Sequence, residues 1–242
     1  MEEGKDGLVK NAVRNGANVL SMQQGAVTVV DVLGWKGIWQ RKSNAMEALR
    51  GIRDLIGHLQ KSDLPGLAPE IWGFSDTIIL TAYGEPGSVL PVHTNMSSMA
   101  LSFCLSDNLP ARGAIGYGKF CCMDNMLIGP AVDEVFSWYE AVEWLGAVLT
   151  PTASFYYRPE DFRADNVIDY DVPLAGGGKY AMKCVDWLDD RKDEAELLRC
   201  FRDTASVMTP DVAPKYQNTV EFFRYVRKFK ASKGARLLDK KR

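Results

Sequence analysis

The sequence has few of the residues from which disulfide scaffolds and zinc sites are built. Its 242 residues include five cysteines and two histidines. The number of cysteines is odd, and no pair has the C-x-x-C spacing of a zinc site or a redox motif. We therefore expect reduced cysteines and no Cys/His zinc site.

The sequence also lacks long apolar runs and a marked excess of charge. Residues 1–20 are polar and charged, and no segment approaches the roughly 20 apolar residues that a membrane span needs. The 29 basic and 31 acidic residues give a net charge of -2, which does not favour nucleic acid or an anionic membrane as a partner. These absences predict a cytoplasmic protein with no membrane or nucleic-acid partner.

The first half of the sequence predicts one strand, one helix and a hairpin. The apolar run predicts a strand over 26–32, and the helical spacing of apolar residues predicts a helix over 43–60, capped by Ser43 or Asn44. The segment 69–84 predicts two short strands that meet at a tight turn near 73–76.

The second half predicts alternating helices and strands, followed by a charged end. The order of elements predicts an α+β fold with an antiparallel or mixed sheet and helices on one face. Beyond Trp187 the chain is charged and helical, and we interpret its basic end as a solvated helix face or an interaction tail. The predicted elements are a helix over 94–108, a strand over 111–122, a helix over 131–146 that ends at Gly146, and strands over 147–157 and 179–187.

Two carboxylates occur at predicted strand ends. Asp31 ends the first strand, and Asp76 lies at the tip of the hairpin. If these strands are neighbours, the two side chains meet at one end of the sheet, where they could hold two divalent cations. Their oxygen ligands suit Mg²⁺ or Mn²⁺. Taken singly, Asp76 could be only a turn residue and Asp31 only a helix cap.

These segments resemble the catalytic domains of class III nucleotidyl cyclases. "VVDVLGWKG" resembles the family's first strand and phosphate loop, and "GFSDTIIL" resembles its second metal hairpin. "RGAIGYGKF" and "IGPAVDEVFSWYEAVEWLG" resemble the later strand and helix. The resemblance implies a ferredoxin-like fold with a mostly antiparallel sheet. It divides the chain into an N-terminal segment (1–23), a catalytic domain (24–188) and a C-terminal helical extension (189–242).

The resemblance also implies roles for individual residues. Asp31, Asp76 and the Val32 carbonyl would hold two Mn²⁺ or Mg²⁺ ions, which would act on a ribonucleoside triphosphate. Asp133 stands where the family has its catalytic Asn. The phosphates would lie against backbone N–H groups from Leu33 to Gly37, a segment that includes Gly34 and Trp35, at the start of a helix.

Departures from the family pattern fall in the base pocket. Trp72 and Met126 occupy the two positions where purine cyclases have charged or polar base-reading residues. One explanation is a catalytically inactive fold kept for nucleotide or partner binding; the other is an active enzyme that reads a different base. Two carboxylates without metal repel each other, so their retention favours the second explanation. A palm-like polymerase or dinucleotide cyclase is a further alternative, although no GGDEF-like hairpin occurs.

The combination resembles the pyrimidine nucleotide cyclases of the Pycsar anti-phage system. This resemblance implies a uridylate cyclase that makes 3',5'-cyclic UMP for a separate effector, with cytidylate cyclase as the alternative. It also implies a head-to-tail homodimer with two equivalent sites.

One positive charge of the family site is missing from its usual place. Ser137 stands where the family has an Arg that stabilises the transition state. For each basic candidate an ordinary surface or salt-bridge role competes with catalysis, and for the nearby aromatics Trp72, Phe74 and Tyr117 core packing competes with base stacking. The basic candidates are Arg112, Lys119, Lys179 and Lys183.

Overall fold

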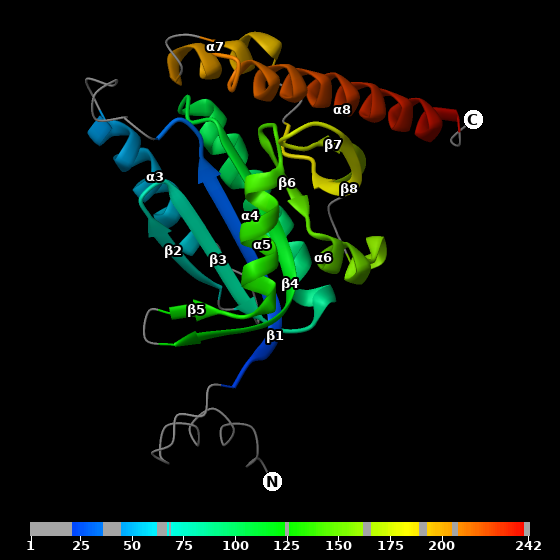
Figure 1. Cartoon of the computed structure of the whole chain (residues 1–242). Coiled ribbons are helices and arrows are strands. Elements are labelled where there is room, and N and C mark those ends of the chain that lie inside the picture. The colour runs from blue at the N-terminus through cyan, green and yellow to red at the C-terminus, as the bar shows by residue number, and fades with distance from the viewer. Residues whose placement is uncertain are drawn as a thin grey trace.

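We describe the fold from a computed structural model of the chain (Figure 1), in which the described residues are 21–35, 45–61, 67, 69–123, 126–161, 166–188, 193–204 and 208–239. These residues form one mixed sheet of eight strands with helices packed against it. The α+β class is therefore confirmed. The strands are β1 (Gln23–Val32), β2 (Glu70–Phe74), β3 (Thr77–Tyr83), β4 (Ala111–Met123), β5 (Met126–Ile128), β6 (Gly146–Leu149), β7 (Val167–Pro173) and β8 (Lys179–Val185).

The strand order is β2-β3-β1-β4-β6-β8-β7, with β5 paired to β4 off this path. Every pairing is antiparallel except that between β4 and β6, which is parallel. The central strand β1 is buried along most of its length, as its apolar sequence predicts. It pairs with β3 on one side and β4 on the other, so the ends of all three strands lie together.

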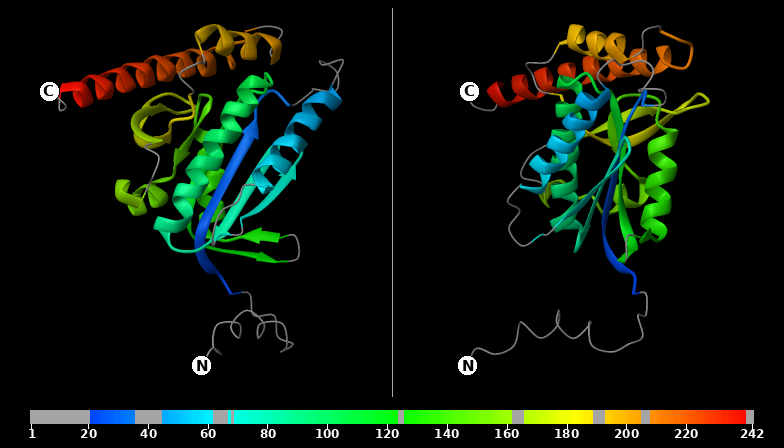
Figure 2. Two further views of the ribbon diagram at one scale, coloured as in Figure 1. Left: turned by 180° about the vertical axis from the view of Figure 1, so that it is seen from behind. Right: turned by 90° about the vertical axis from the view of Figure 1, so that its left-hand side faces the viewer.

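Helices cover both faces of this sheet (Figure 2), so the prediction of helices on one face was wrong. α3 (Ala45–Gln60) and α4 (Pro86–Ser106) lie on one face, and α5 (Pro130–Ala141) lies on the other. Glycine at position 116 allows α5 to pack close to β4, because a Cβ there would come within 2.4 Å of Val135 Cγ2. Alternate residues of β1 face the two helix layers. Val27 lies opposite Gly116, on the α5 side, whereas the Thr28 hydroxyl is hydrogen-bonded to His93 of α4.

The predicted ends of two elements, α5 and the strand that follows it, were wrong. The helix predicted over 131–146 ends at Ala141, and Gly146 begins β6 instead of ending a helix. Val142 is extended because it forms a bridge with Leu174, so tertiary pairing overrides the helical pattern there. The strand predicted over 147–157 stops at Leu149, because Pro151 begins the short helix α6 (Pro151–Tyr156).

Two other differences concern α4 and β7. α4 begins at Pro86, eight residues before the predicted start, and it accommodates Pro91 within its second turn. β7 was not predicted; its pairing with β8 completes the sheet. The caps predicted at Ser43 and Asn44 lie outside the described residues.

Two further helices follow β8, namely α7 (Glu194–Thr204) and α8 (Ala213–Asp239). They lie beyond the end of the sheet at which β1 terminates (Figures 1 and 2). α8 is anchored by its buried residues Val220, Phe222, Phe223 and Val226. In the described part of the chain, the helices are all too short or too polar to span a membrane.

Candidate active site

The backbone brings Asp31 and Asp76 together at one end of the sheet. β1 and β3 are antiparallel neighbours, and Asp31 lies opposite Thr77, the residue that follows Asp76. The N–H of Val32 donates a hydrogen bond of 3.0 Å to the carbonyl of Asp76. The strand adjacency on which the predicted pair depends is therefore present.

The environment of Asp31 disfavours its charged form in the metal-free protein. Burial, followed by the nearby Asp76 carboxylate, raises the pKa of Asp31 to about 6. Two groups act in the opposite direction: Arg112 Nε lies 3.9 Å from Asp31 Oδ2, and Thr77 Oγ1 donates to Asp31 Oδ1 at 3.2 Å. A half-buried carboxylate whose pKa is raised by a neighbouring carboxylate suits a bound cation, which would relieve the repulsion at Asp31.

The available donors suit a hard metal ion. Within the described residues no group of three or more His, Cys, Asp and Glu side chains converges on one point. Asp31 and Asp76 would therefore supply the charged ligands, with backbone carbonyls such as that of Val32, water and substrate oxygens as the others. That donor set fits Mg²⁺ or Mn²⁺, which commonly keep water and phosphate ligands.

The loop after β1 is only partly described. Gly34 has φ +76, a left-handed conformation that favours glycine at this turn. Trp35 is buried, and the N–H of Leu33 donates to the Pro110 carbonyl at 2.6 Å. The predicted phosphate cradle therefore does not include the Leu33 N–H. Residues 36 and 37, and the start of the following helix, lie outside the described residues.

Arg112 is the predicted basic candidate that lies beside the carboxylates. Its Nη1 donates to the carbonyls of Glu140 and Val142 at 3.0 and 3.1 Å, and its guanidinium carbon is 5.6 Å from the centre of the Tyr139 ring. These contacts hold Arg112 between β1 and the end of α5.

The other three basic candidates have different surroundings. Lys179 pairs with Glu221 and Lys183 pairs with Asp169. Lys119 is exposed and lies opposite Gln24, near the start of β1, at the far end from Asp31.

A row of side chains crosses the sheet at Asp31. The pairing register places Phe74, Thr77, Asp31 and Arg112 side by side on four strands. Phe74 is 79% exposed, so the core role weighed for it is wrong.

Trp72 lies on the same face and is half-buried, whereas Tyr117 is a buried core residue whose hydroxyl donates to the Gly84 carbonyl. Sequence reasoning missed Thr77. Two features of the sequence could have indicated it: Thr77 follows Asp76 directly, and the alternation of side chains between the two faces of a strand places it on the face of Asp31.

Within one chain, Asp133 and Met126 lie away from the carboxylates of Asp31 and Asp76. Asp133 lies in α5 between Ala131 and Val135, which pack against Gly116, four positions and about 13 Å along β4 from Arg112. Met126 is 53% exposed and pairs with Met123, still further along β4. One chain therefore presents two separate sets of predicted site residues.

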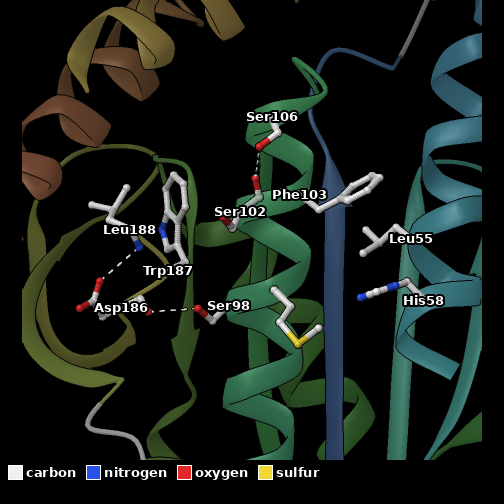
Figure 3. A pocket seen from close by; sticks show the side chains of 10 residues that line it. Leu55, His58, Ser98, Ser102, Phe103, Ser106, Asp186, Trp187 and Leu188 are labelled. Carbon is white, nitrogen blue, oxygen red and sulfur yellow. Dashed lines mark hydrogen bonds between the residues drawn. The ribbon is translucent and has the colours of Figure 1, made fainter. Parts of the chain in front are cut away.

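A hollow of about 450 Å³ lies on the opposite face of the sheet (Figure 3). α4 forms its floor with Ser98 and Phe103, and His58 of α3 and Trp187 border it on either side. None of its lining residues belongs to the predicted site.

Comparisons with known proteins identify the fold. No protein-family description and no curated protein sequence matches the chain. Two structures of a bacterial light-regulated adenylyl cyclase are similar, each with a TM-score of 0.50 over 76% of this chain, at 11% and 12% identity. The match covers 58% of the first structure's chain and 100% of the second's. The chain therefore has the fold of a class III cyclase catalytic domain.

Proposed function

We propose that the chain is a metal-dependent nucleotidyl cyclase that converts UTP to 3',5'-cyclic UMP and pyrophosphate. The observation that carries the proposal is the pair Asp31 and Asp76 on neighbouring strands, combined with Trp72 and Met126 at the two base-reading positions. The metal-binding half of a cyclase site is retained while its purine-reading half is replaced. CTP, with cyclic CMP as the product, is the alternative substrate.

In this proposal Asp31, Asp76 and the Val32 carbonyl would hold two Mn²⁺ or Mg²⁺ ions. When bound, the ions would supply the charge that lowers the pKa of the ribose 3'-hydroxyl and that offsets negative charge on the α-phosphate and the leaving pyrophosphate. Thr77 orients Asp31 through its hydroxyl hydrogen bond. The loop at Gly34 and Trp35 lies against the triphosphate.

Arg112 is proposed to supply the positive charge that Ser137 cannot. Its guanidinium already lies 3.9 Å from Asp31, the distance measured from Nε to Oδ2. A fixed cation at this place would stabilise negative charge that develops on the α-phosphate.

The proposed active form is a head-to-tail homodimer. Asp133 and Met126 lie far along β4 from the carboxylates, so a second copy would have to bring these residues to the site. Exposed Phe74 and half-buried Trp72 lie on the side of the sheet that would face that copy. We further propose that residues 24–188 contain the catalytic residues and that a separate effector reads the product in anti-phage defence.

The test is to incubate the purified chain with Mn²⁺ and each of ATP, GTP, CTP and UTP, and to identify products by mass spectrometry. Cyclic UMP from UTP supports the proposal, and cyclic CMP from CTP moves the assignment to the alternative base. A purine product would contradict the proposed base pocket. The absence of product from all four, with the protein folded and dimeric, would favour a nucleotide- or partner-binding domain, and a dinucleotide product would favour a palm-like enzyme.

A further inference from the structure

Residues 140–145, which include the last two residues of α5 and lead to β6, form a corner that is held from two sides. Arg112 contacts its first part and α8 contacts its second part. We propose that α8 belongs to the catalytic unit: by clamping this corner, it positions Arg112 beside Asp31. The catalytic consequence rests on the proposed function; the positioning itself does not.

On the first side, the corner fixes the guanidinium of Arg112. Both hydrogen bonds of its Nη1 go to backbone carbonyls of the corner, those of Glu140 and Val142. Within the described residues its buried Nε–H has no hydrogen-bond acceptor, and Asp31 at 3.9 Å is too distant to be one. The place of the guanidinium is therefore set by the corner rather than by the carboxylate.

On the second side, polar residues of α8 bind Glu143 and Leu145. The N–H of Leu145 donates to Thr219 Oγ1 at 2.8 Å, and Asn218 Nδ2 donates to the Glu143 carbonyl at 2.8 Å. Lys215 Nζ also pairs with the Glu143 carboxylate. Thr219 is fully buried, so loss of its hydroxyl would leave the Leu145 N–H without an acceptor.

An apolar contact lies between these polar ones. Trp144 is fully buried and meets the ring of Phe222 of α8 edge-on, with ring centres 4.3 Å apart. Trp144 also stacks on Tyr170 of β7 at 5.3 Å, and the rings of Tyr170 and Phe222 contact each other at 5.0 Å. Glu143, Trp144 and Leu145 are therefore all held by α8, directly after the Val142 carbonyl that holds Arg112.

This arrangement explains why α5 ends at Ala141. The sequence continues with helical spacing, but α8 takes residues 143–145 out of the helix, and the carbonyls of Glu140 and Val142 turn to Arg112 instead. Backbone groups at a helix end need such partners. Loosening α8 should release the corner and with it the guanidinium.

The experiment compares Thr219→Val with Thr219→Ser in the full chain. Valine removes the acceptor for the Leu145 N–H with little change in volume, whereas serine keeps it. The readout is the Arg112 Nε–H cross-peak in ¹H–¹⁵N NMR spectra, assigned by its loss in Arg112→Lys. Asn218→Ala is the second variant. Arg224→Ala is the matched control on α8, because within the described residues it breaks an exposed ion pair, that with Glu194, away from the corner.

We expect a shifted Arg112 Nε–H peak with about tenfold faster hydrogen exchange in Thr219→Val and Asn218→Ala, because a held guanidinium exchanges through opening of its surroundings. Thr219→Ser and Arg224→Ala should match the wild type. Where turnover is measurable, kcat should fall about tenfold in the first two variants, with KM nearly unchanged, since the charge acts in the transition state.

An unchanged Arg112 peak in folded Thr219→Val and Asn218→Ala overturns the proposal. A wild-type spectrum without a peak that disappears in Arg112→Lys also overturns it, because the guanidinium would then not be held. If no triphosphate is cyclised, the NMR result still decides whether α8 positions Arg112, so the two failures are distinguishable.

Discussion

Two titratable side chains, Asp31 of β1 and His93 of α4, lie on opposite faces of β1 and differ in almost every respect. On the α5 face, Asp31 reaches the surface and has charged neighbours, and burial together with Asp76 raises its pKa to about 6. On the α4 face, His93 is completely buried, its Nδ1 lies 2.7 Å from Thr28 Oγ1, and burial lowers its pKa to about 3. Only two residues of one strand separate Thr28 from Asp31.

The comparison teaches what burial alone does and what it does not. Burial drives both groups toward their neutral forms. His93 stays neutral inside a helix-sheet interface, which is a structural role. Arg112 and Thr77 favour the charged form of Asp31, and a carboxylate with a raised pKa beside a second carboxylate is common at binding and catalytic sites.

The two groups give stability opposite dependences on pH. The unfolded chain binds a proton at His93 below about pH 6.5 and the folded chain does not until about pH 3, so stability falls as the pH drops through this window. The folded chain binds a proton at Asp31 below about pH 6, whereas an unfolded Asp does so only near its ordinary value of 3.8. This second group makes stability fall as the pH rises from 3.8 to 6.

The largest expected effect is on turnover at the Asp31 face. Asp31→Ala or Asp76→Ala should reduce cyclase turnover by about 10³-fold or more, because each removes a charged metal ligand and several kcal/mol of transition-state stabilisation. The measurement is product formation with Mn²⁺, alongside circular dichroism to show that the fold is intact. Near-normal turnover in either folded variant would rule out the proposed metal site.

The next effect tests the His93 face. When the pH is lowered from 7 to 4, the unfolding free energy of both proteins should decrease. The decrease should be about 3 kcal/mol smaller in His93→Gln than in the wild type, since one pKa unit corresponds to 1.36 kcal/mol. Urea unfolding at both pH values measures it. His58→Gln, at the chain's other histidine, which is exposed on α3, is the matched control. Equal losses in His93→Gln and wild type would mean that His93 is not held neutral.

A smaller effect of opposite sign is expected at Asp31. Without metal at pH 7, Asp31→Asn should raise the unfolding free energy by about 2 kcal/mol, a value reduced from the full pKa shift because the side chain still reaches water. At pH 4 the gain should disappear, since the folded wild type is then protonated. Asp169→Asn, at an exposed ion-paired carboxylate, should stay within about 0.5 kcal/mol of the wild type. Destabilisation by Asp31→Asn at pH 7 would contradict the raised pKa.

The smallest effect on the stability of a single chain is expected at two exposed aromatic residues, one on each face of the sheet. Phe74→Ser should change the stability of one chain by less than about 0.5 kcal/mol, because the ring is largely exposed, but it should weaken the proposed dimer. Analytical ultracentrifugation measures the dimer. Phe155→Ser, at a ring that is 84% exposed on α6, is the control on the other side of the sheet. A stronger loss of dimer in Phe155→Ser would place the dimer contact on the wrong face.

Much of the fold could be predicted because local patterns dominate it. The apolar run of β1, the hairpin around Asp76 and the glycine-rich strand β4 each follow from their own residues. The errors occur where distant segments compete with local preference. The residues after Ala141 continue a helical pattern, but Arg112, Leu174 and α8 bind them, so the helix ends early.

The sequence by itself determined the elements that carry the two aspartates and the absence of charged side chains at Trp72 and Met126. It did so because strand periodicity and residue chemistry are local properties. Only the tertiary structure decided that β1 and β3 are neighbours, that Arg112 faces Asp31 and that α8 holds the corner beside it. These facts depend on contacts between residues far apart in the chain, whose pairing is set by the packing of the whole core.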